Sequence, residues 1–250
     1  MAINDVQLHL LIAAVRRLRK TAGDRRLEVL AFGYPDLLLS KKRLEELVGT
    51  DLARNLPERA DAAKIRAWYG MAHEEPIYDS LALFDRLGMN VTIADVVALQ
   101  GMERIVDLND PLPDDLRRRF DFVIDPGTCE HCFNVGMAFR NVCEAVRLGG
   151  FLVHMAPLTL VNHGFWNFSP TVYPDYFEAN GFSLLHMAGY AYKPDSSLEV
   201  FTVKPFENFT PPMKGLIYVV AERIGEQDPI WPIQRKYQTL LSPAAKGPPK

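Results

Sequence analysis

The chain has 250 residues, 48% of them hydrophobic, and its 28 Lys+Arg against 31 Asp+Glu give a formal charge of −3 and a pI of about 6.1. This balance excludes a nucleic-acid-binding polycation, and the length suffices to bury one sizeable core. No apolar run reaches membrane-spanning length, and the first residues lack the order of a secretory signal. We expect a cytoplasmic protein that binds no nucleic acid and does not insert into a membrane, and a homo-oligomer is possible.

The first 36 residues predict a helix and then a strand. Apolar residues recur at helical spacing between 6 and 18, and basic residues follow at the helix's C-terminal end, so 1–22 is predicted to be an N-terminal amphipathic helix. Packing on a sheet edge is preferred for it over a membrane-surface role. Residues 27–32 read as the first strand, and a Gly-Tyr-Pro-Asp turn follows at 33–36.

Residues 37–78 predict a helical insertion or lid, because the segment is too short to form its own core. Trp68 and Tyr69 within it could cover a ligand, although packing is the commoner use of such aromatic residues. A short helix is predicted at 80–87, a second strand at 90–95 and a third at 105–107.

A strand–helix–strand unit at 119–155 organises the chain. An apolar run ends at an Asp-Pro-Gly turn at 125–127, a helix is predicted from 128 to about 146, and Gly149-Gly150 stops it before the next strand at 151–155. Ligands of open parallel sheets bind beyond the carboxyl ends of the strands, so 125–131 is predicted to lie at the functional site.

The last third predicts an aromatic loop at 161–170, a short helix at 173–179 and strands at 182–192, 198–203 and 215–221. Because loops join the late strands, an antiparallel C-terminal hairpin is expected. Residues 1–225 are expected to form one domain, and the proline-rich tail at 226–250 an extended strap with a disordered end.

The order of these segments resembles that of class I S-adenosylmethionine-dependent methyltransferases over roughly residues 27–222. The matching pieces are 29–33, 91–95, 107–113, 120–125, 128–131 and 148–152. The resemblance implies a doubly wound, mostly parallel, seven-stranded α/β sheet of the Rossmann-like type. It also implies S-adenosylmethionine as cofactor. Similar methyltransferase-like proteins with the Gly-Tyr-Pro-Asp turn are associated with bacterial surface-polysaccharide or small-molecule biosynthesis.

The resemblance also implies roles for individual residues. Gly33 would pass under the methionine part of the cofactor, Asp95 would accept hydrogen bonds from the ribose, and Asp107 with Leu108 would flank the adenine. The full set of expected cofactor-binding residues is Gly33, Tyr34, Asp36, Asp95, Asp107, Leu108, Asp125, Gly127 and Thr128. The turn at 33–36 departs from the glycine-rich loop of the family, so either the cofactor is held in an altered way or its binding has been lost.

The Cys129-Glu-His-Cys132 stretch admits three interpretations. A zinc site lacks a second close pair of ligands, and a redox pair would rest on a single Cys-x-x-Cys motif. Structural cysteines are preferred, with no metal and, from an odd count of three cysteines, no disulfide framework.

His163 and His131 are the candidate catalytic bases, because each lies on a loop beyond a predicted strand. Hydrogen bonds that brace the loop or cap the helix are the equal alternative for both. His154 lies inside an apolar strand and is expected to be a hydrogen-bonded core histidine. Packing is again the alternative for the expected substrate-binding residues, which are Glu130, Phe165, Trp166 and Phe168.

Three functions follow. The first is methyl transfer to an oxygen or nitrogen of a small molecule or sugar, the second a non-catalytic methyltransferase-like binding module, and the third another small-molecule or redox enzyme on an α/β sheet.

Overall fold

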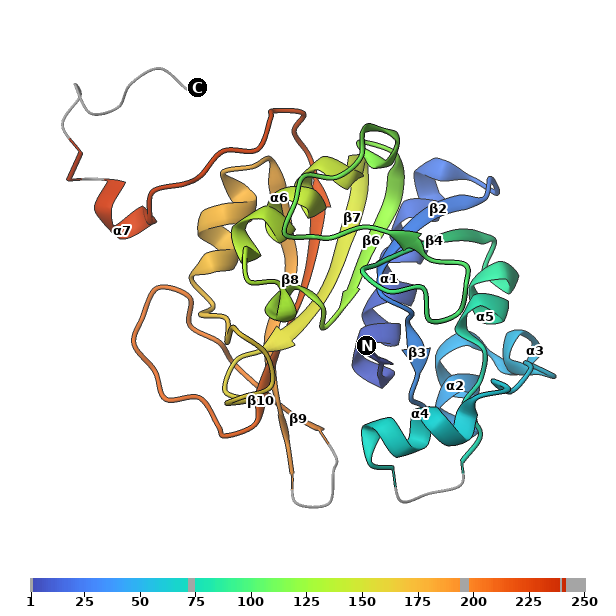
Figure 1. Ribbon diagram of the computed structural model, residues 1–250. Coiled ribbons are helices and arrows are strands. Elements are labelled where there is room, and N and C mark those ends of the chain that lie inside the picture. Colours follow the sequence, from blue (N-terminus) through green and yellow to red (C-terminus); the bar gives the residue numbers. More distant parts are fainter. Residues whose placement is uncertain (1, 72–74, 194–197, 239, 242–250) are drawn as a thin grey trace.

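A computed structural model describes all residues except 1, 72–74, 194–197, 239 and 242–250. At its centre lies an eight-stranded sheet with the order β5-β4-β2-β6-β7-β10-β8-β9 (Figure 1). The strands are β2 (Leu27–Phe32), β4 (Met89–Asp95), β5 (Arg104–Ile105), β6 (Phe120–Pro126), β7 (Val146–Pro157), β8 (Phe182–Tyr192), β9 (Leu198–Phe201) and β10 (Gly215–Arg223). The first five strands of this order, from β5 through β4, β2 and β6 to β7, pair in parallel. Strand β10 pairs antiparallel with both β7 and β8, and β8 pairs antiparallel with β9.

The prediction of a doubly wound, mostly parallel sheet with an antiparallel C-terminal part is confirmed. The number of strands is eight and not seven, because β9 pairs with β8 at the edge of the sheet. Strands β2 and β6 are neighbours in the sheet although β4 and β5 lie between them in sequence. Strand order therefore reverses between β2 and β6, and a ligand site is expected beyond their carboxyl ends.

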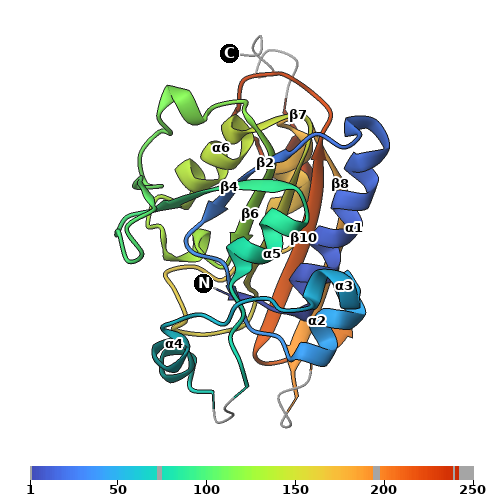
Figure 2. The same cartoon turned by 90° about the vertical axis from the view of Figure 1, so that its right-hand side faces the viewer.

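Alternate residues of the central strands face two separate cores, as the two-residue period of a strand requires. Phe122 and Ile124 of β6 pack with α1 (Asp5–Ala22), α2 (Lys41–Val48) and α5 (Ser80–Arg86), whereas Val123 packs with α6 (Val135–Ala145) and the π-helix η3 (Pro174–Glu178). Figure 2 shows helices on both sides of the sheet. Because both faces of the sheet are covered, the sequences of the central strands are nearly continuous apolar runs.

The predicted insertion at 37–78 contains three helices and a strand. Strand β3 (Asp36–Leu37) pairs in parallel with β1 (Ala2–Ile3), and α2, α3 (Thr50–Ala53) and α4 (Ala62–Tyr69) follow. The β1–β3 pair ties the start of the chain to the insertion. A small cluster around Ile65 and Ile77 fixes α4.

The structure corrects the prediction for 128–151. The first turn is the 3₁₀ helix η2 (Cys129–His131), and α6 begins only after Asn134, whose side chain accepts a hydrogen bond from the Met137 N–H at 3.2 Å. Helix α6 ends at Ala145, close to the predicted end and before the glycine pair, because β-branched Val146 already pairs with Phe120 of β6. Gly149, with φ of 74°, lies inside β7 at the irregular stretch of this pairing.

The remaining short elements are η1 (Asp114–Leu116) and, in the predicted tail, α7 (Arg235–Gln238). The expected disordered end at 242–250 lies outside the described residues. No helix in the part of the chain that the structure describes has the length and apolar content needed to cross a membrane.

Candidate functional site

The end of β2 and the loops after β4, β5 and β6 meet at the point where strand order reverses. The Thr128 hydroxyl donates a hydrogen bond to the Phe32 carbonyl at 2.6 Å, which joins the end of β2 to the loop after β6. Beside this contact lies a cavity of about 200 Å³, which we call the strand-end cavity. It is lined by Ala94, Asp95, Val96, Val106, Asp107, Leu108, Asn109, Thr128, His131 and Cys132.

Four of the residues predicted to bind the cofactor, Asp95, Asp107, Leu108 and Thr128, share this cavity. An Asp95 carboxylate oxygen accepts the Val97 N–H at 3.2 Å, and Asp107 accepts the Asn109 N–H at 2.9 Å. A carboxylate has about four acceptor positions, so each can accept further hydrogen bonds. Buried Leu108 adds an apolar wall. The cavity therefore combines acceptors for hydroxyl groups with a surface for a flat apolar group.

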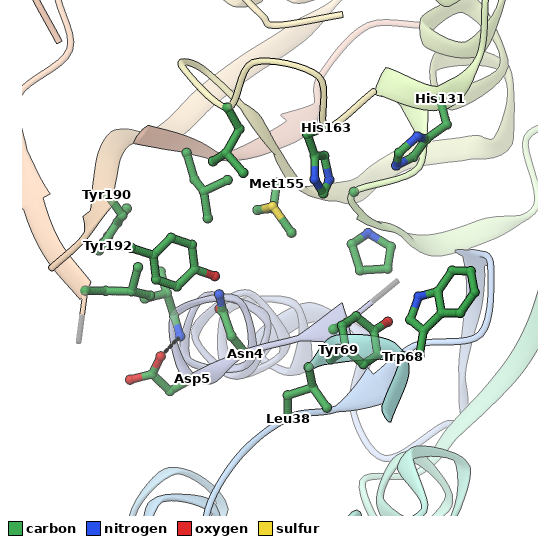
Figure 3. Close-up of a pocket in the computed structure, with 17 residues that line it drawn as sticks. Asn4, Asp5, Leu38, Trp68, Tyr69, His131, Met155, His163, Tyr190 and Tyr192 are labelled. Carbon is green, nitrogen blue, oxygen red and sulfur yellow. Dashed lines mark hydrogen bonds between the residues drawn. The ribbon is translucent and has the colours of Figure 1, made fainter. Parts of the chain in front are cut away.

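A larger cavity of about 1020 Å³ opens between the N-terminus, α4, the loops after β6 and β7, and the ends of β8 and β10 (Figure 3). We call it the large cavity. Its lining is Ala2, Asn4, Asp5, Val6, Leu38, Trp68, Tyr69, Pro126, Gly127, His131, Met155, Leu160, His163, Tyr190, Tyr192, Leu198 and Leu216. Among these lining residues there is no lysine or arginine.

His131 lines both cavities, so it marks the place where they adjoin. The ring of His163 lies beside it at the upper edge of the view in Figure 3, with 5.3 Å between the two ring centroids. The two histidines predicted to be catalytic are thus brought together, although 32 positions separate them in sequence.

Glu130, predicted to bind substrate, is fully buried. Its Oε1 atom is 3.5 Å from Nε2 of His163. Neither carboxylate oxygen has a hydrogen-bond partner among the described residues. The close contact with Glu130 and its negative charge raise the pKa of His163 above its ordinary value. Partial burial of the ring lowers this pKa but does not outweigh Glu130.

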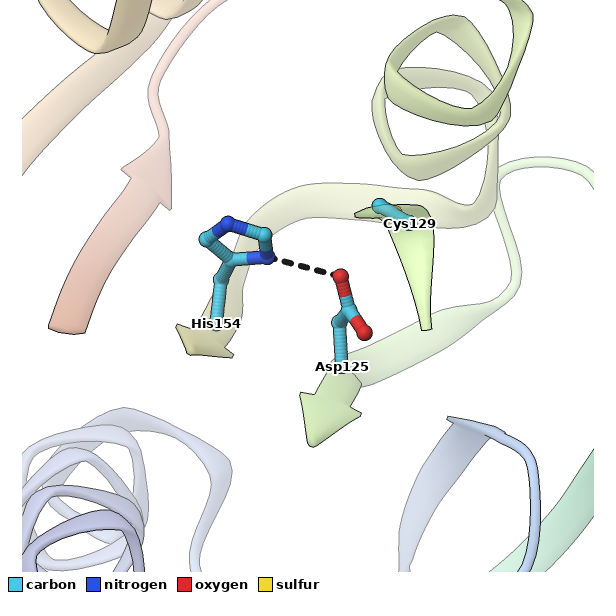
Figure 4. A group of neighbouring side chains, drawn as sticks. All are labelled: Asp125, Cys129 and His154. Atoms are coloured by element: carbon cyan, nitrogen blue, oxygen red, sulfur yellow. Dashed lines mark hydrogen bonds and ion pairs between the residues drawn. The ribbon is translucent and has the colours of Figure 1, made fainter. Parts of the chain in front are cut away.

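Asp125, predicted to bind the cofactor, instead turns its carboxylate into the core. One oxygen accepts the N–H groups of Gly127 and Thr128 at 3.2 and 2.7 Å, and the other lies 2.7 Å from Nδ1 of His154 (Figure 4). Burial raises the pKa of Asp125, but the charge and hydrogen bond of His154, with those from Cys129 and Thr128, outweigh it and hold this pKa below its ordinary value. Asp125 therefore shapes the turn and lines neither cavity.

The expectation of a hydrogen-bonded core histidine at His154 is confirmed. Its Nδ1 lies against Asp125, and its Nε2 lies 2.9 Å from the hydroxyl of buried Tyr173. Both ring nitrogens are thus satisfied.

None of the three aromatic residues predicted to bind substrate, Phe165, Trp166 and Phe168, lines the large cavity. Phe168 is only 6% exposed and stacks on Phe139 in the core at 5.3 Å between centroids. Phe165 is 66% exposed and contacts Phe133 edge-on at 5.6 Å, while the indole N–H of Trp166 donates to the Cys132 carbonyl at 3.0 Å. Only Leu160 and His163 of this region line the large cavity.

The Gly-Tyr-Pro-Asp turn borders a third cavity of about 410 Å³, lined by Tyr34, Asp36, Arg59, Asp61, Lys64, Ile65, Trp68, Tyr69, Asp95, Val97, Leu99 and Gln100. The Arg59 guanidinium stacks over the Tyr34 ring at 4.0 Å. Gly33 is buried, has φ of 78° and donates its N–H to the Ala94 carbonyl at 2.7 Å, but it lines none of these three cavities. This third cavity shares Asp95 with the strand-end cavity, and Trp68 and Tyr69 with the large cavity.

All three cysteines are free and buried. Burial, followed by the nearby charge of Asp125, raises the pKa of the Cys129 thiol well above its ordinary value, and burial raises the pKa of Cys132 to about 12. A protonated thiol is a poor nucleophile. These surroundings favour the structural interpretation over a redox pair.

The sequence missed a group of cavity residues that come from distant elements: Asn4, Met155, Tyr190 and Tyr192. Tyr190 and Tyr192 are two positions apart on β8 and so share one face of the strand, a signal that the alternation of aromatic residues could have supplied. The N-terminal residues carried no such signal, because the β1–β3 pair that places them is only two residues long.

No protein-family model matches the chain, and no curated protein matches it either. Similar solved structures include the 1,6-didemethyltoxoflavin-N1-methyltransferase of Burkholderia thailandensis, at 13% identity over 85% of this chain and 77% of that chain, with a TM-score of 0.45. TehB from Haemophilus influenzae is 13% identical over 84% of this chain and 62% of that chain, with a TM-score of 0.45. The N-methyltransferase NodS from Bradyrhizobium japonicum is 11% identical over 86% of this chain and 94% of that chain, with a TM-score of 0.41.

Proposed function

We propose that this chain transfers a methyl group from S-adenosylmethionine to an oxygen or nitrogen of a small molecule or sugar in a bacterial biosynthetic pathway. The observation that carries the proposal is the strand-end cavity, in which Asp95, Asp107 and Leu108 converge at the ends of neighbouring strands. Carboxylates that accept hydrogen bonds beside an apolar wall suit the ribose hydroxyls and the adenine ring of an adenosyl group.

The acceptor is assigned to the large cavity. Because His131 lines both cavities, an adenosyl group in the strand-end cavity would direct its sulfonium methyl toward the two histidines. Catalysis would then consist mostly of alignment of the methyl group with the acceptor atom. His163 or His131 would serve as the base that accepts a proton from that atom. Glu130 would support this pair and not bind the acceptor directly.

The lining of the large cavity supports a neutral or cationic acceptor. Asp5 is its one acidic residue, and its described lining has no lysine or arginine to pair with a phosphate or carboxylate. Trp68, Tyr190 and Tyr192 offer aromatic faces of the kind that contact sugar rings and other flat or apolar groups.

A second candidate is a non-catalytic binding module with the same fold. It is favoured by Tyr34 and Pro35, which stand where a glycine-rich loop would let the cofactor approach, and by Arg59, which stacks on the Tyr34 ring. A protein that had lost cofactor binding could retain the large cavity for a partner or ligand.

Calorimetric titration of the purified chain with S-adenosylhomocysteine separates the two candidates. The proposed enzyme binds one equivalent, and the module binds none. S-adenosylhomocysteine is the better probe because it cannot be consumed during the titration. Absence of binding at millimolar ligand would remove methyl transfer as the function.

A further inference from the structure

The carboxylate of Glu130 is buried and has no hydrogen-bond partner among the described residues. The side chain is fully shielded from solvent. Leaving a buried carboxylate in this state is costly, and in proteins such groups are normally paired or bound to a metal. Nε2 of His163 lies 3.5 Å from the Oε1 atom of Glu130, and a ring nitrogen of His131 also lies close to the carboxylate.

One oxygen or nitrogen atom from each of Glu130, His131 and His163 lies within 4.8 Å of the other two. Backbone contacts fix this arrangement, since the Glu130 carbonyl accepts the N–H groups of Phe165 and Trp166 at 2.9 and 3.3 Å. The loop that carries His163 is thereby attached to the turn that carries His131.

Two glycines make room for the Glu130 side chain. A Cβ atom on Gly164 would lie 2.8 Å from the Glu130 carbonyl oxygen, and one on Gly127 would lie 3.0 Å from Oε1. Gly127 also has φ of 94°, which other residues rarely adopt. The chain therefore packs closely around the carboxylate while leaving its oxygens unbonded.

We propose that Glu130, His131 and His163 bind a divalent transition-metal ion at the edge of the large cavity. Two imidazoles and one carboxylate are a ligand set that suits Zn²⁺, Fe²⁺ or Mn²⁺, whereas Mg²⁺ and Ca²⁺ prefer oxygen ligands. Three protein ligands leave coordination positions open, and both histidines line the cavity, so these positions face the place assigned to the acceptor.

A second group of possible ligands, Asp125, Cys129 and His154, is a poorer candidate. All three residues are fully buried or nearly so, and Asp125 and His154 already satisfy each other and the Tyr173 hydroxyl. The carboxylate of Glu130 has no hydrogen-bond partner among the described residues, and its contact with Nε2 of His163 is longer, at 3.5 Å. The metal site is proposed independently of methyl transfer. A ring nitrogen that binds the ion cannot accept a proton, so metal binding would replace the proton-accepting role of His131 and His163.

The test is titration of the full, EDTA-treated chain with Co²⁺ alone, followed by visible absorption. We expect one equivalent to bind with ligand-field bands, Zn²⁺ to displace it and Mg²⁺ to leave it in place. His131→Ala and Glu130→Gln should each weaken Co²⁺ binding by at least roughly a hundredfold. His9→Ala, at an exposed histidine on α1, is the matched control and should bind as the wild type does.

Because Glu130 is buried, its variant requires a check of folding by circular dichroism, whereas exposed His131 can be replaced without disturbing the core. Failure of the wild type to bind stoichiometric Co²⁺ would overturn the proposal. Unchanged binding in both variants, or intense thiolate-to-Co²⁺ absorption, would overturn it as well. Titration with S-adenosylhomocysteine in the same samples reports on the proposed function separately.

Discussion

Oε1 of Glu130 lies 3.5 Å from Nε2 of His163, which links a fully buried carboxylate to a histidine that is 44% exposed at the edge of the large cavity. Glu130 precedes His131, whose side chain lines both cavities. One short turn after β6 therefore connects the place proposed for the cofactor with the place proposed for the acceptor.

Asp95 should account for a measurable part of cofactor affinity. Asp95→Ala removes the carboxylate that would accept the ribose hydroxyls, so S-adenosylhomocysteine binding should weaken by about 1.5–3 kcal/mol, or roughly ten- to more than a hundredfold. Calorimetry measures the change. Asp110→Ala, an exposed aspartate that lines neither cavity, is the control and should bind normally. Equal affinities in the two variants would refute the assignment of Asp95.

The Asp125–His154 pair should matter for stability more than for ligand binding. Because both residues are buried, His154→Ala leaves an uncompensated carboxylate and should lower the free energy of unfolding by about 3–5 kcal/mol, measured by urea denaturation. The matched control is His186→Ala, at a half-buried histidine on β8 away from this pair. A loss no larger than that of the control would show that the pair contributes little.

The same pair predicts a dependence of stability on pH. The pKa of Asp125 is lower in the folded than in the unfolded chain, so its contribution is present above the ordinary carboxyl pKa of about 3.9 and is lost as pH falls through the folded value. Asp125→Asn should flatten this acidic part of the stability curve. Parallel curves for the wild type and the variant below pH 4 would contradict the lowered pKa.

The thiols should be unreactive in the native protein. A pKa of about 12 leaves only about one Cys132 thiolate in 10⁵ at pH 7, and Cys129 is shifted in the same direction. Titration with a chromogenic disulfide reagent should detect three thiols promptly in denaturant and react only slowly without it. Rapid native reaction of Cys132 would instead support a redox role.

Phe165 and Phe168 should behave oppositely when replaced by alanine. Phe168→Ala opens a cavity beside Phe139 and should cost about 3–5 kcal/mol of stability. Phe165→Ala, at an exposed ring, should change the free energy of unfolding by no more than about 0.5 kcal/mol. Denaturant unfolding of both variants measures this difference, and similar losses would mean that the loop packs in another way.

Local patterns predicted the strands and the edge of the sheet where the site lies. Asp95, Asp107 and Thr128 could be expected to meet because each follows a strand at the same edge. The strand pattern does not show whether a side chain at this edge points into the site or into the core. Asp125 faces inward, where His154 on the neighbouring strand β7 and the N–H groups of its own turn supply its partners.

The large cavity was harder to predict because residues far apart in sequence, from Ala2 to Leu216, form it. Asn4 reaches it through the two-residue β1–β3 pair, and Tyr192 through the end of β8. His163 was singled out, but its partner Glu130 could not be connected to it before the backbone contacts of the 161–170 loop were known.

The most direct test of the account is a crystal structure of the chain grown with S-adenosylhomocysteine. We predict electron density for the adenosyl group in the strand-end cavity, with the ribose hydroxyls on Asp95, the adenine against Leu108, and the sulfur directed toward His131 and the large cavity. An adenosyl group bound elsewhere, or an empty strand-end cavity at saturating ligand, would contradict it.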